Sequence, residues 1–446
     1  MIPGNRCTHD PAQGLILQGL LTQAKAGSLM RRSKVLSVKF AIRINLMKML
    51  SRLMAFVVLV ATSLPLLADD SSRIDSSRIK EIAAGLPHSQ AGSLLFLSQA
   101  DRDLAFRHMA DIYPTRKISA GPNSFAMPTR LRDLSGLTYS VEGSTLKLAD
   151  YLAMPETKGF LVWQDGNILF EHYGPGHDQD THWVSFSVAK SVTAMLIGAA
   201  MADGYIESVD EPITNYVPRF RGTDYEGASI KNVLQMASGV AWNEDYADPQ
   251  SDAARAGGIN GIALRNYLAE LKRVAPPGEV FNYNTGETNL VGEILRSAIG
   301  NNAATYLTHK IWQPFGMGSD ATWLLGSAGG GETGGCCINA TLRDYARIGI
   351  FALNDGQLPD GTRVLPAGWM QASTRPSKGY QGYGYLWWLD EGGSYRARGI
   401  FGQQIYIDPQ SRTVIAVHSN AQAAVDSPYH AHLEQVVAAV AGALQK

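Results

Sequence analysis

Cysteine is scarce in this sequence, with 3 residues among 446. Cys336 and Cys337 are neighbours, an arrangement in which a disulfide is strained, and Cys7 lies far from both. This scarcity excludes a disulfide scaffold, and it equally excludes a zinc site built from cysteine ligands.

Charged residues are also few. They make up 18% of the chain, and the formal net charge is −1. Without a basic excess, the sequence predicts neither a nucleic-acid partner nor an anionic membrane surface as a partner. The hydrophobic fraction of 45% is large enough for a sizeable core. No oligomeric state follows from this composition.

Several well-known catalytic motifs are missing. The sequence has no Gly-x-Ser-x-Gly elbow and no His-Glu-x-x-His zinc motif. The glycine-rich segment 326–335 lacks the Gly-Lys-Ser/Thr end of a phosphate-binding loop, so we interpret it as a loop near the cleft. His430 and His432 have no accompanying carboxylate or cysteine cluster, which favours a surface helix over a metal site. We therefore predict no metal and no cofactor.

No hydrophobic run reaches the length of a typical membrane span. The longest candidate, Leu53–Leu67, has about 15 residues and contains Pro65, which is short for a spanning helix. Basic residues precede it and Ala68 ends it, a pattern typical of a secretory signal. We expect residues 1–68 to be an N-terminal extension and signal peptide, and the mature protein to be periplasmic or secreted without a stable membrane span. An uncleaved anchor is the alternative.

The remaining chain changes character along its length. Short sequential strands near both ends imply an antiparallel sheet with a helical region inserted between its parts. The predicted fold class is α/β of the α+β type, with helices flanking the sheet and a mostly helical insertion. The expected parts are a flexible lead-in at 69–95, a first α/β part with the nucleophile helix at 96–204, the helical insertion at 205–375, and closing strands and a helix at 376–446.

Ser187-Val188-Ala189-Lys190 is the first chemically informative motif. Residues three apart on a helix share one face, so the amine of Lys190 can reach the hydroxyl of Ser187. The following residues are largely apolar, so we expect a buried helix in which desolvation lowers the lysine pKa. The alternative interpretation is a capping serine followed by a solvated lysine. Ser185 and Ser191 are rival hydroxyls, but neither has a lysine three residues later.

Two further motifs follow along the chain. Tyr283 stands just before a predicted helix, where its phenol can enter a cleft and relay a proton; a packed aromatic at a helix entry is the alternative. The segment 399–403, Gly-Ile-Phe-Gly-Gln, ends a predicted strand. Its glycines allow a backbone to approach a ligand closely, so one of its N–H groups could serve an oxyanion.

Taken in order, these motifs resemble those of the penicillin-recognising serine hydrolases, and within them the class C β-lactamase-like branch. Longer segments resemble the 6-aminohexanoate-dimer hydrolases and carboxylesterases of that branch. The resemblance covers about residues 100–444 and implies a β-lactamase/transpeptidase-like fold. The segments that carry it are SFSVAKSVTAMLIGAAMADGYIESVDEPITNYVP, MASGVAWNEDY, FNYNTGETNLVGE, INATLRDYARIGIFALNDG, YGYLWW and GIFGQQIYIDP.

The resemblance implies a role for five residues. Ser187 is the acylated nucleophile, and Lys190 and Tyr283 form the proton-transfer pair. Tyr246 matches a tyrosine that contacts the leaving amine in amide hydrolases of this group. Gln403 matches the position whose N–H joins that of Ser187 in the oxyanion hole, within a register margin of one to three residues.

The sequence departs from β-lactamases at two places. Thr285 stands where they carry asparagine, and Ile400 lies at a substrate-binding position where they carry lysine or histidine. That cation would bind the β-lactam carboxylate. Its absence argues against antibiotic hydrolysis unless Arg396 or Arg398 substitutes for it.

The sequence therefore predicts a serine hydrolase that cleaves amide or ester bonds of small linear substrates through an acyl-enzyme on Ser187. A small-molecule ester or amide is the expected partner. Two alternatives stay open: a β-lactamase-like or D,D-peptidase-like enzyme, and a non-catalytic relative that binds cell-wall fragments.

Overall fold

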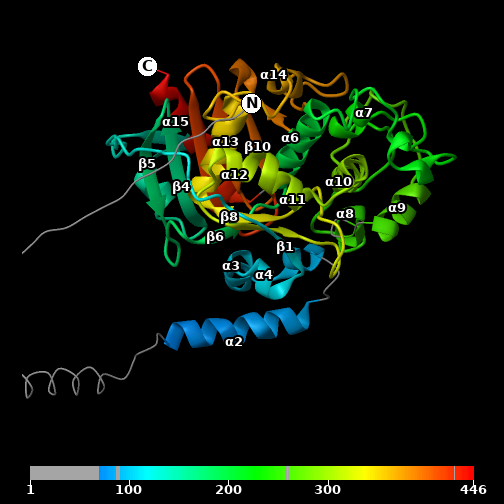
Figure 1. Ribbon diagram of the computed structural model, residues 1–446. Helices are drawn as coiled ribbons and strands as arrows, with labels where there is room; N and C mark the ends of the chain where they lie inside the picture. The colour runs from blue at the N-terminus through cyan, green and yellow to red at the C-terminus, as the bar shows by residue number, and fades with distance from the viewer. Residues whose placement is uncertain (1–69, 87–90, 257–258, 260, 426, 446) are drawn as a thin grey trace, which may run out of the picture. The chain divides into compact units, whose positions relative to one another are not determined.

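A six-stranded antiparallel sheet dominates the computed structural model of the protein (Figure 1). The structure describes residues 70–86, 91–256, 259, 261–425 and 427–445. The predicted signal segment therefore lies outside the described residues. Within these residues, no helix combines the length and the apolar character needed to cross a membrane.

The central sheet joins strands from both ends of the chain. Its order is β5-β4-β12-β11-β10-β9, so β4 near the N-terminal end pairs with β12 near the C-terminal end. The bounds are β4 Thr157–Gln164, β5 Asn167–Tyr173, β9 Trp388–Leu389, β10 Tyr395–Arg398, β11 Gln404–Asp408 and β12 Thr413–Ser419.

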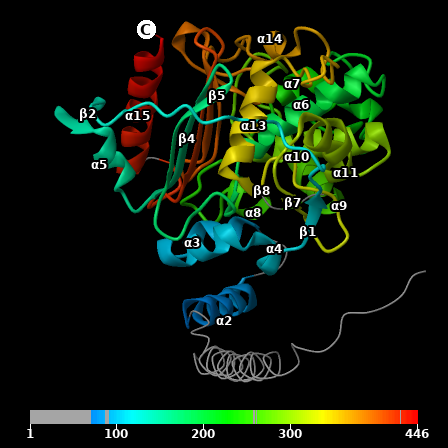
Figure 2. The ribbon, with the colours of Figure 1, turned by 60° about the vertical axis from the view of Figure 1, so that its left-hand side comes forward.

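Two helices cover opposite faces of this sheet, α13 (Leu342–Leu353) and α15 (Pro428–Leu444), as Figure 2 shows. Successive side chains of a strand point to opposite faces. Val414 of β12 accordingly packs in the cluster that contains α13 side chains, and the next residue, Ile415, packs in the cluster that contains α15 side chains. Burial on both faces explains why the central strands are almost continuously hydrophobic.

β4 and β5 form a hairpin. Asp165 and Gly166 form its turn with φ of 41° and 95°. Both values lie in the left-handed region that suits a tight hairpin turn. A short hairpin made of β2 (Thr138–Val141) and β3 (Ser144–Lys147) forms a separate two-stranded sheet, and α5 (Leu148–Leu152) follows it.

A second sheet was not expected from the sequence. It has four strands in the order β1-β7-β8-β6. Two of them, together with α13, come from the region predicted as a helical insertion, so the chain returns to sheet structure before residue 375. The bounds are β1 Thr115–Ile118, β6 His182–Val184, β7 Ala321–Leu324 and β8 Ile338–Thr341.

The segment between β6 and β7 is mostly helical: it begins with the long buried helix α6 (Val188–Ala202), and the predicted insertion starts after this helix. α10 (Thr285–Ile299) packs against α6. The other elements are η2 Ile213–Asn215, η3 Pro218–Phe220, α7 Ile230–Leu234, α8 Asp252–Ala256, α9 Gly261–Glu270, α11 Ala303–Leu307, η4 Thr308–Trp312 and α12 Gln313–Phe315. Later in the chain come α14 Trp369–Ser373 and η5 Glu391–Gly393.

The described part of the predicted lead-in at 69–95 is largely helical. It contains α2 (Asp70–Gly85), and η1 (Ala91–Phe96) begins within it. Ile79 and Ile82 are buried. Their three-residue spacing places both on one helix face, which gives this polar segment an apolar stripe to pack. α3 (Gln99–Arg107) and α4 (Met109–Ile112) follow.

Gly239 sits where no side chain fits. Its φ is 80°, and a Cβ added there would overlap the carbonyl oxygen of Ala275. We expect Gly239→Ala to lower the free energy of unfolding by about 2–4 kcal/mol, through backbone strain together with overpacking. Gly204 is a matched control, because its φ is 78° but nothing lies within 4 Å of the added Cβ.

Gly204→Ala should cost only the backbone strain, about 1 kcal/mol. Urea unfolding of the two variants and the parent protein measures the difference. Equal losses in both variants would show that the contact with Ala275 does not matter.

Candidate active site

Ser187 stands at the N-terminal end of α6, at the N-cap position. The preceding residue, Phe186, has φ of 43°, in the left-handed region that non-glycine residues rarely adopt. This turn ends β6 sharply and leaves the Ser187 side chain facing a pocket. Backbone strain of this kind is concentrated at functional sites.

The two rival serines are engaged elsewhere. Ser185 Oγ accepts a hydrogen bond from the Ile338 N–H at 2.8 Å and donates one to the Phe186 carbonyl at 3.0 Å. Ser191 Oγ donates to the Leu386 carbonyl at 2.7 Å. Both hydroxyls therefore have structural partners.

Lys190 is buried on the same helix, with 1% of its surface exposed. Its Nζ donates hydrogen bonds to Thr285 Oγ1 at 2.9 Å and to the Gly335 carbonyl at 3.0 Å. Burial lowers the pKa of Lys190 to about 8, and the charge of Glu244 opposes that shift. The predicted loop at 326–335 thus reaches the cleft through Gly335.

Tyr283 enters the site from the loop before α10. Lys190 Nζ lies 5.4 Å from its ring centroid, and Trp388 stacks on the ring at 5.4 Å. Burial raises the pKa of the Tyr283 phenol and the charge of Glu244 raises it further, while a hydrogen bond with Ser187 acts in the opposite direction. The structure therefore brings Ser187, Lys190 and Tyr283 together.

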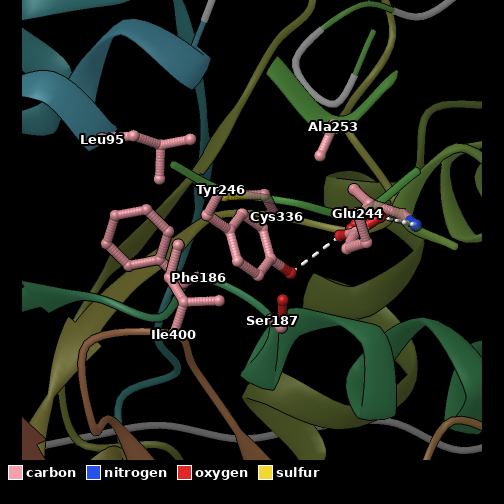
Figure 3. Close-up of a pocket in the computed structure, with 10 residues that line it drawn as sticks. Leu95, Phe186, Ser187, Glu244, Tyr246, Ala253, Cys336 and Ile400 are labelled. Carbon is pink, nitrogen blue, oxygen red and sulfur yellow. Dashed lines mark hydrogen bonds between the residues drawn. The ribbon is translucent and has the colours of Figure 1, made fainter. Parts of the chain in front are cut away.

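Two hollows meet at these residues. A small pocket contains Ser187, Thr285 and Gly335 together with apolar side chains (Figure 3). A neighbouring cavity of about 740 Å³ contains Tyr283 and extends past Trp388 along the start of α15. Glu244, Tyr246 and Ile400 line both hollows; the apolar side chains of the small pocket are Leu95, Phe186, Tyr246, Ala253, Cys336 and Ile400.

The third motif brings a backbone turn close to Ser187. A Cβ on Gly399 would lie 2.7 Å from the Ser185 carbonyl, so only glycine allows this approach. The carbonyl of Ile400 is held by the Val425 N–H at 2.9 Å and lies 3.1 Å from His430 Nε2. Among the described residues, the N–H groups of Ser187 and Ile400 have no hydrogen-bond acceptor.

Gln403 lies in the wall of the larger cavity and not in the small pocket. Its side chain is fully buried: Oε1 accepts from the Phe401 N–H at 3.2 Å and Nε2 donates to the Ser419 carbonyl at 3.1 Å. Gln403 thus braces the turn that presents Ile400. Ile400 lies three positions before Gln403, which is within the one to three residues of uncertainty given above for the position of the second oxyanion donor.

The two candidate cations on β10 are both paired with carboxylates. Arg396 binds Asp390 and Glu434, each at 2.7 Å, and Arg398 Nη2 binds Glu434 Oε1 at 2.7 Å. Arg398 lines the larger cavity; Arg396 does not. Their charge is therefore largely balanced within the protein.

Glu244 is a site residue that the sequence did not indicate. Its Oε1 accepts from the Tyr246 hydroxyl at 2.7 Å (Figure 3) and from Thr285 Oγ1. Its Oε2 accepts from the Thr285 N–H at 3.0 Å and from Trp242 Nε1. In the sequence it is one of two adjacent acidic residues before Tyr246, and no spacing rule distinguishes it from its neighbour.

Metal ligands do not gather anywhere in the described part of the chain. His432 Nδ1 lies 3.0 Å from the Tyr139 hydroxyl, and His430 faces the larger cavity, so this pair is tied into the fold more closely than a surface helix suggested. Cys336 and Cys337 are bonded to each other, although their adjacency argued against it. A bond between neighbours links no separate segments and so forms no scaffold.

Comparison with known proteins agrees with this architecture. Residues 156–439 match the sequence model of the Beta-lactamase family. A 6-aminohexanoate-dimer hydrolase from Paenarthrobacter ureafaciens is 30% identical over 283 residues, which covers 58% of this chain and 71% of that protein. The chain belongs to the Beta-lactamase family of hydrolases.

Solved structures show the same fold. A Bacillus anthracis protein, assigned provisionally as a 6-aminohexanoate-dimer hydrolase, superposes with a TM-score of 0.67 at 23% identity and covers 76% of this chain and 94% of its own. A family VIII carboxylesterase superposes with a TM-score of 0.52 at 17% identity, and the match covers 65% of this chain and 96% of the carboxylesterase. The predicted β-lactamase/transpeptidase-like fold is confirmed.

Ser187→Ala should abolish labelling by a fluorophosphonate probe and reduce ester turnover by several orders of magnitude, because the variant lacks the attacking oxygen. Ser185→Ala and Ser191→Ala are controls that should keep labelling, since their hydroxyls bind backbone carbonyls. Gel fluorescence with thermal melts measures both properties. Loss of labelling in a folded control variant, with Ser187→Ala still labelled, would reassign the nucleophile.

Proposed function

We propose that this protein is a serine hydrolase that cleaves amide or ester bonds of small linear substrates through an acyl-enzyme on Ser187. The observation that carries the proposal is the convergence of three groups: Ser187 at the start of α6, the buried Lys190 one turn along the same helix, and Tyr283, whose ring centroid lies 5.4 Å from Lys190 Nζ; the pKa of Lys190 is lowered to about 8. Solvated surface residues would have neither the burial nor the shift. The similarity to a 6-aminohexanoate-dimer hydrolase supports the same class of substrate.

In the proposed reaction, Ser187 Oγ attacks the carbonyl carbon of the substrate. The serine proton passes to the Lys190–Tyr283 pair and then to the leaving alcohol or amine, and the acyl group stays on Ser187. Water then gives a proton to the same pair and attacks the acyl carbon. The Ser187 oxygen leaves and regains its proton, and the acid is released. A non-catalytic binder would not need this activated hydroxyl.

The N–H groups of Ser187 and Ile400 are the proposed oxyanion donors. Both lack an acceptor within the described chain, and both residues line the small pocket. Two preorganised backbone donors stabilise the tetrahedral intermediate as negative charge develops on its oxygen. We therefore prefer the Ile400 N–H to that of Gln403.

Tyr246 favours amides with an N–H group. Its hydroxyl proton is donated to Glu244 Oε1 at 2.7 Å, so its oxygen is left as an acceptor toward the cavity. Burial raises the pKa of this phenol and Glu244 raises it further, so it stays protonated. Such an oxygen can accept a hydrogen bond from the departing nitrogen of a linear amide, a contact that esters lack.

Compared with a short-chain p-nitrophenyl ester, nitrocefin should be the poorer substrate. Ile400 brings no charge, and Glu434 already neutralises Arg398. A β-lactam carboxylate that lacks one charge-assisted hydrogen bond loses about 1.5–3 kcal/mol, or about ten- to a hundredfold in binding. Specificity constants for the two substrates provide the measurement.

A higher specificity constant for nitrocefin would support the β-lactamase-like alternative instead. Arg398→Ala then serves as the second arm of the experiment. Selective loss of nitrocefin turnover in that variant would show that Arg398 replaces the missing cation.

We also propose that the protein is exported and that its mature chain begins near Asp69. The support is the basic and then apolar segment that ends at Ala68. N-terminal sequencing of protein from the periplasmic or culture fraction should start near Asp69. A cytoplasmic product that retains Met1 would contradict this proposal.

A further inference from the structure

Glu244 is placed to control the hydrogen-bond direction of two hydroxyls. Its Oε1 accepts hydrogen bonds from both Thr285 Oγ1 and Tyr246 Oη, while the Thr285 N–H and Trp242 Nε1 donate hydrogen bonds to Oε2. The backbone N–H and the indole can only donate. The carboxylate is therefore anchored on one side by fixed donors and faces rotatable hydroxyls on the other.

Thr285 links this carboxylate to Lys190. A hydroxyl has one proton, and here it points to Glu244, so only the oxygen lone pairs of Thr285 face Lys190 Nζ at 2.9 Å. The Gly335 carbonyl, at 3.0 Å, can also only accept. Lys190 thus donates hydrogen bonds to two groups that act only as acceptors toward it.

This arrangement matters when Lys190 is neutral. A neutral amine has two N–H bonds and one lone pair. Thr285 and Gly335 take both N–H bonds, so the lone pair is left for the side of the nitrogen where Ser187 and Tyr283 lie. If the Thr285 hydroxyl turned round, it would donate to that lone pair and compete with Ser187.

We propose that Glu244 is a positioning residue: by holding Thr285 Oγ1 as an acceptor, it directs the lone pair of neutral Lys190 toward Ser187 and Tyr283. This inference rests on the proposed function, because it assigns Lys190 the role of base. Glu244 itself does not need to touch the bond that is cleaved.

Replacement by glutamine tests the hydroxyl direction. Trp242 Nε1 and the Thr285 N–H require an acceptor, so the glutamine oxygen faces them and its NH₂ group faces the hydroxyls. Thr285 then accepts from the glutamine and turns its proton toward Lys190. Glu244→Gln should therefore lower the plateau kcat for a p-nitrophenyl ester by about tenfold or more, which is part of the roughly 10²–10⁴-fold that a general base contributes.

The pH profile separates this role from a merely structural one. Within the described residues, Glu244 is the charged group that acts on the pKa of Lys190, and the neighbouring phenols of Tyr283 and Tyr246 stay neutral because their pKa values are raised. Activity needs neutral Lys190 and so should rise through about pH 8 in the parent enzyme. The Glu244 carboxylate raises the pKa of Lys190, so its removal should move the rise of activity with pH to lower pH.

Thr285 supplies a conservative pair of variants. Thr285→Ser keeps the hydroxyl and should have a higher plateau kcat than Thr285→Val, which loses the hydroxyl and should be impaired like Glu244→Gln. Because Glu244 acts through Thr285, the double variant that combines Glu244→Gln with Thr285→Val should be no slower on esters than Thr285→Val alone. Asp245→Asn is the matched control, since Asp245 is exposed and its carboxylate accepts from the Ala247 N–H, away from Thr285 and Lys190.

The outcomes are separable. An unlabelled parent enzyme without ester turnover would overturn the proposed function. With an active parent enzyme, three results would overturn the role of Glu244: an unchanged plateau in Glu244→Gln, an unmoved pH limb, or additive losses in the double variant. If Glu244→Gln does not fold, equal activity of Thr285→Ser and Thr285→Val would overturn it instead.

Discussion

A single buried amine organises the candidate site. Lys190 has almost no contact with water, and its nitrogen is satisfied by a hydroxyl from the start of α10 and a carbonyl from the loop before β8. Burial of an amine disfavours its charged form, and the surrounding hydrogen bonds fix its orientation. Three separate parts of the chain must therefore be correctly folded before this nitrogen can face Ser187.

Two carboxylates beside the hollows are held by neighbouring groups. One carboxylate, Glu244, lies near the amine, and at the far side of the larger cavity Glu434 binds Arg398. The phenol of Tyr283 stays protonated because its pKa is raised. The larger cavity is lined by three carboxylates, those of Glu142, Glu244 and Glu434, and by one guanidinium, that of Arg398.

Local patterns in the sequence were sufficient for the elements that carry Ser187, Lys190 and Tyr283. The residues behind Ser187 are largely apolar, so a buried helix was predicted there, and Tyr283 was predicted to stand just before a helix, which is α10. On a helix, the Ser-x-x-Lys spacing places the two side chains on one face, so their proximity could be predicted. These features depend on neighbours in the sequence and can be deduced from it.

Other features depend on tertiary contacts. The strands of the second sheet have three or four residues each and come from distant segments, so none shows a periodic pattern. The tight turn after β10 brings Ile400, rather than Gln403, into the pocket with Ser187, and its shape is set by buried contacts of Gln403. Glu244 gains its importance only from partners that the fold brings to it.

The pairing of β4 with β12 also affects how the protein reaches its folded state. Val162 lies opposite Ile415, so the middle of the central sheet joins residues that are far apart in the sequence. Closing so long a loop is costly in chain entropy, and folds with many distant contacts form slowly. The chain cannot complete this sheet, or place Ile400 beside Ser187, until its last strands have been synthesised. The nascent protein is therefore without an assembled pocket throughout most of its synthesis.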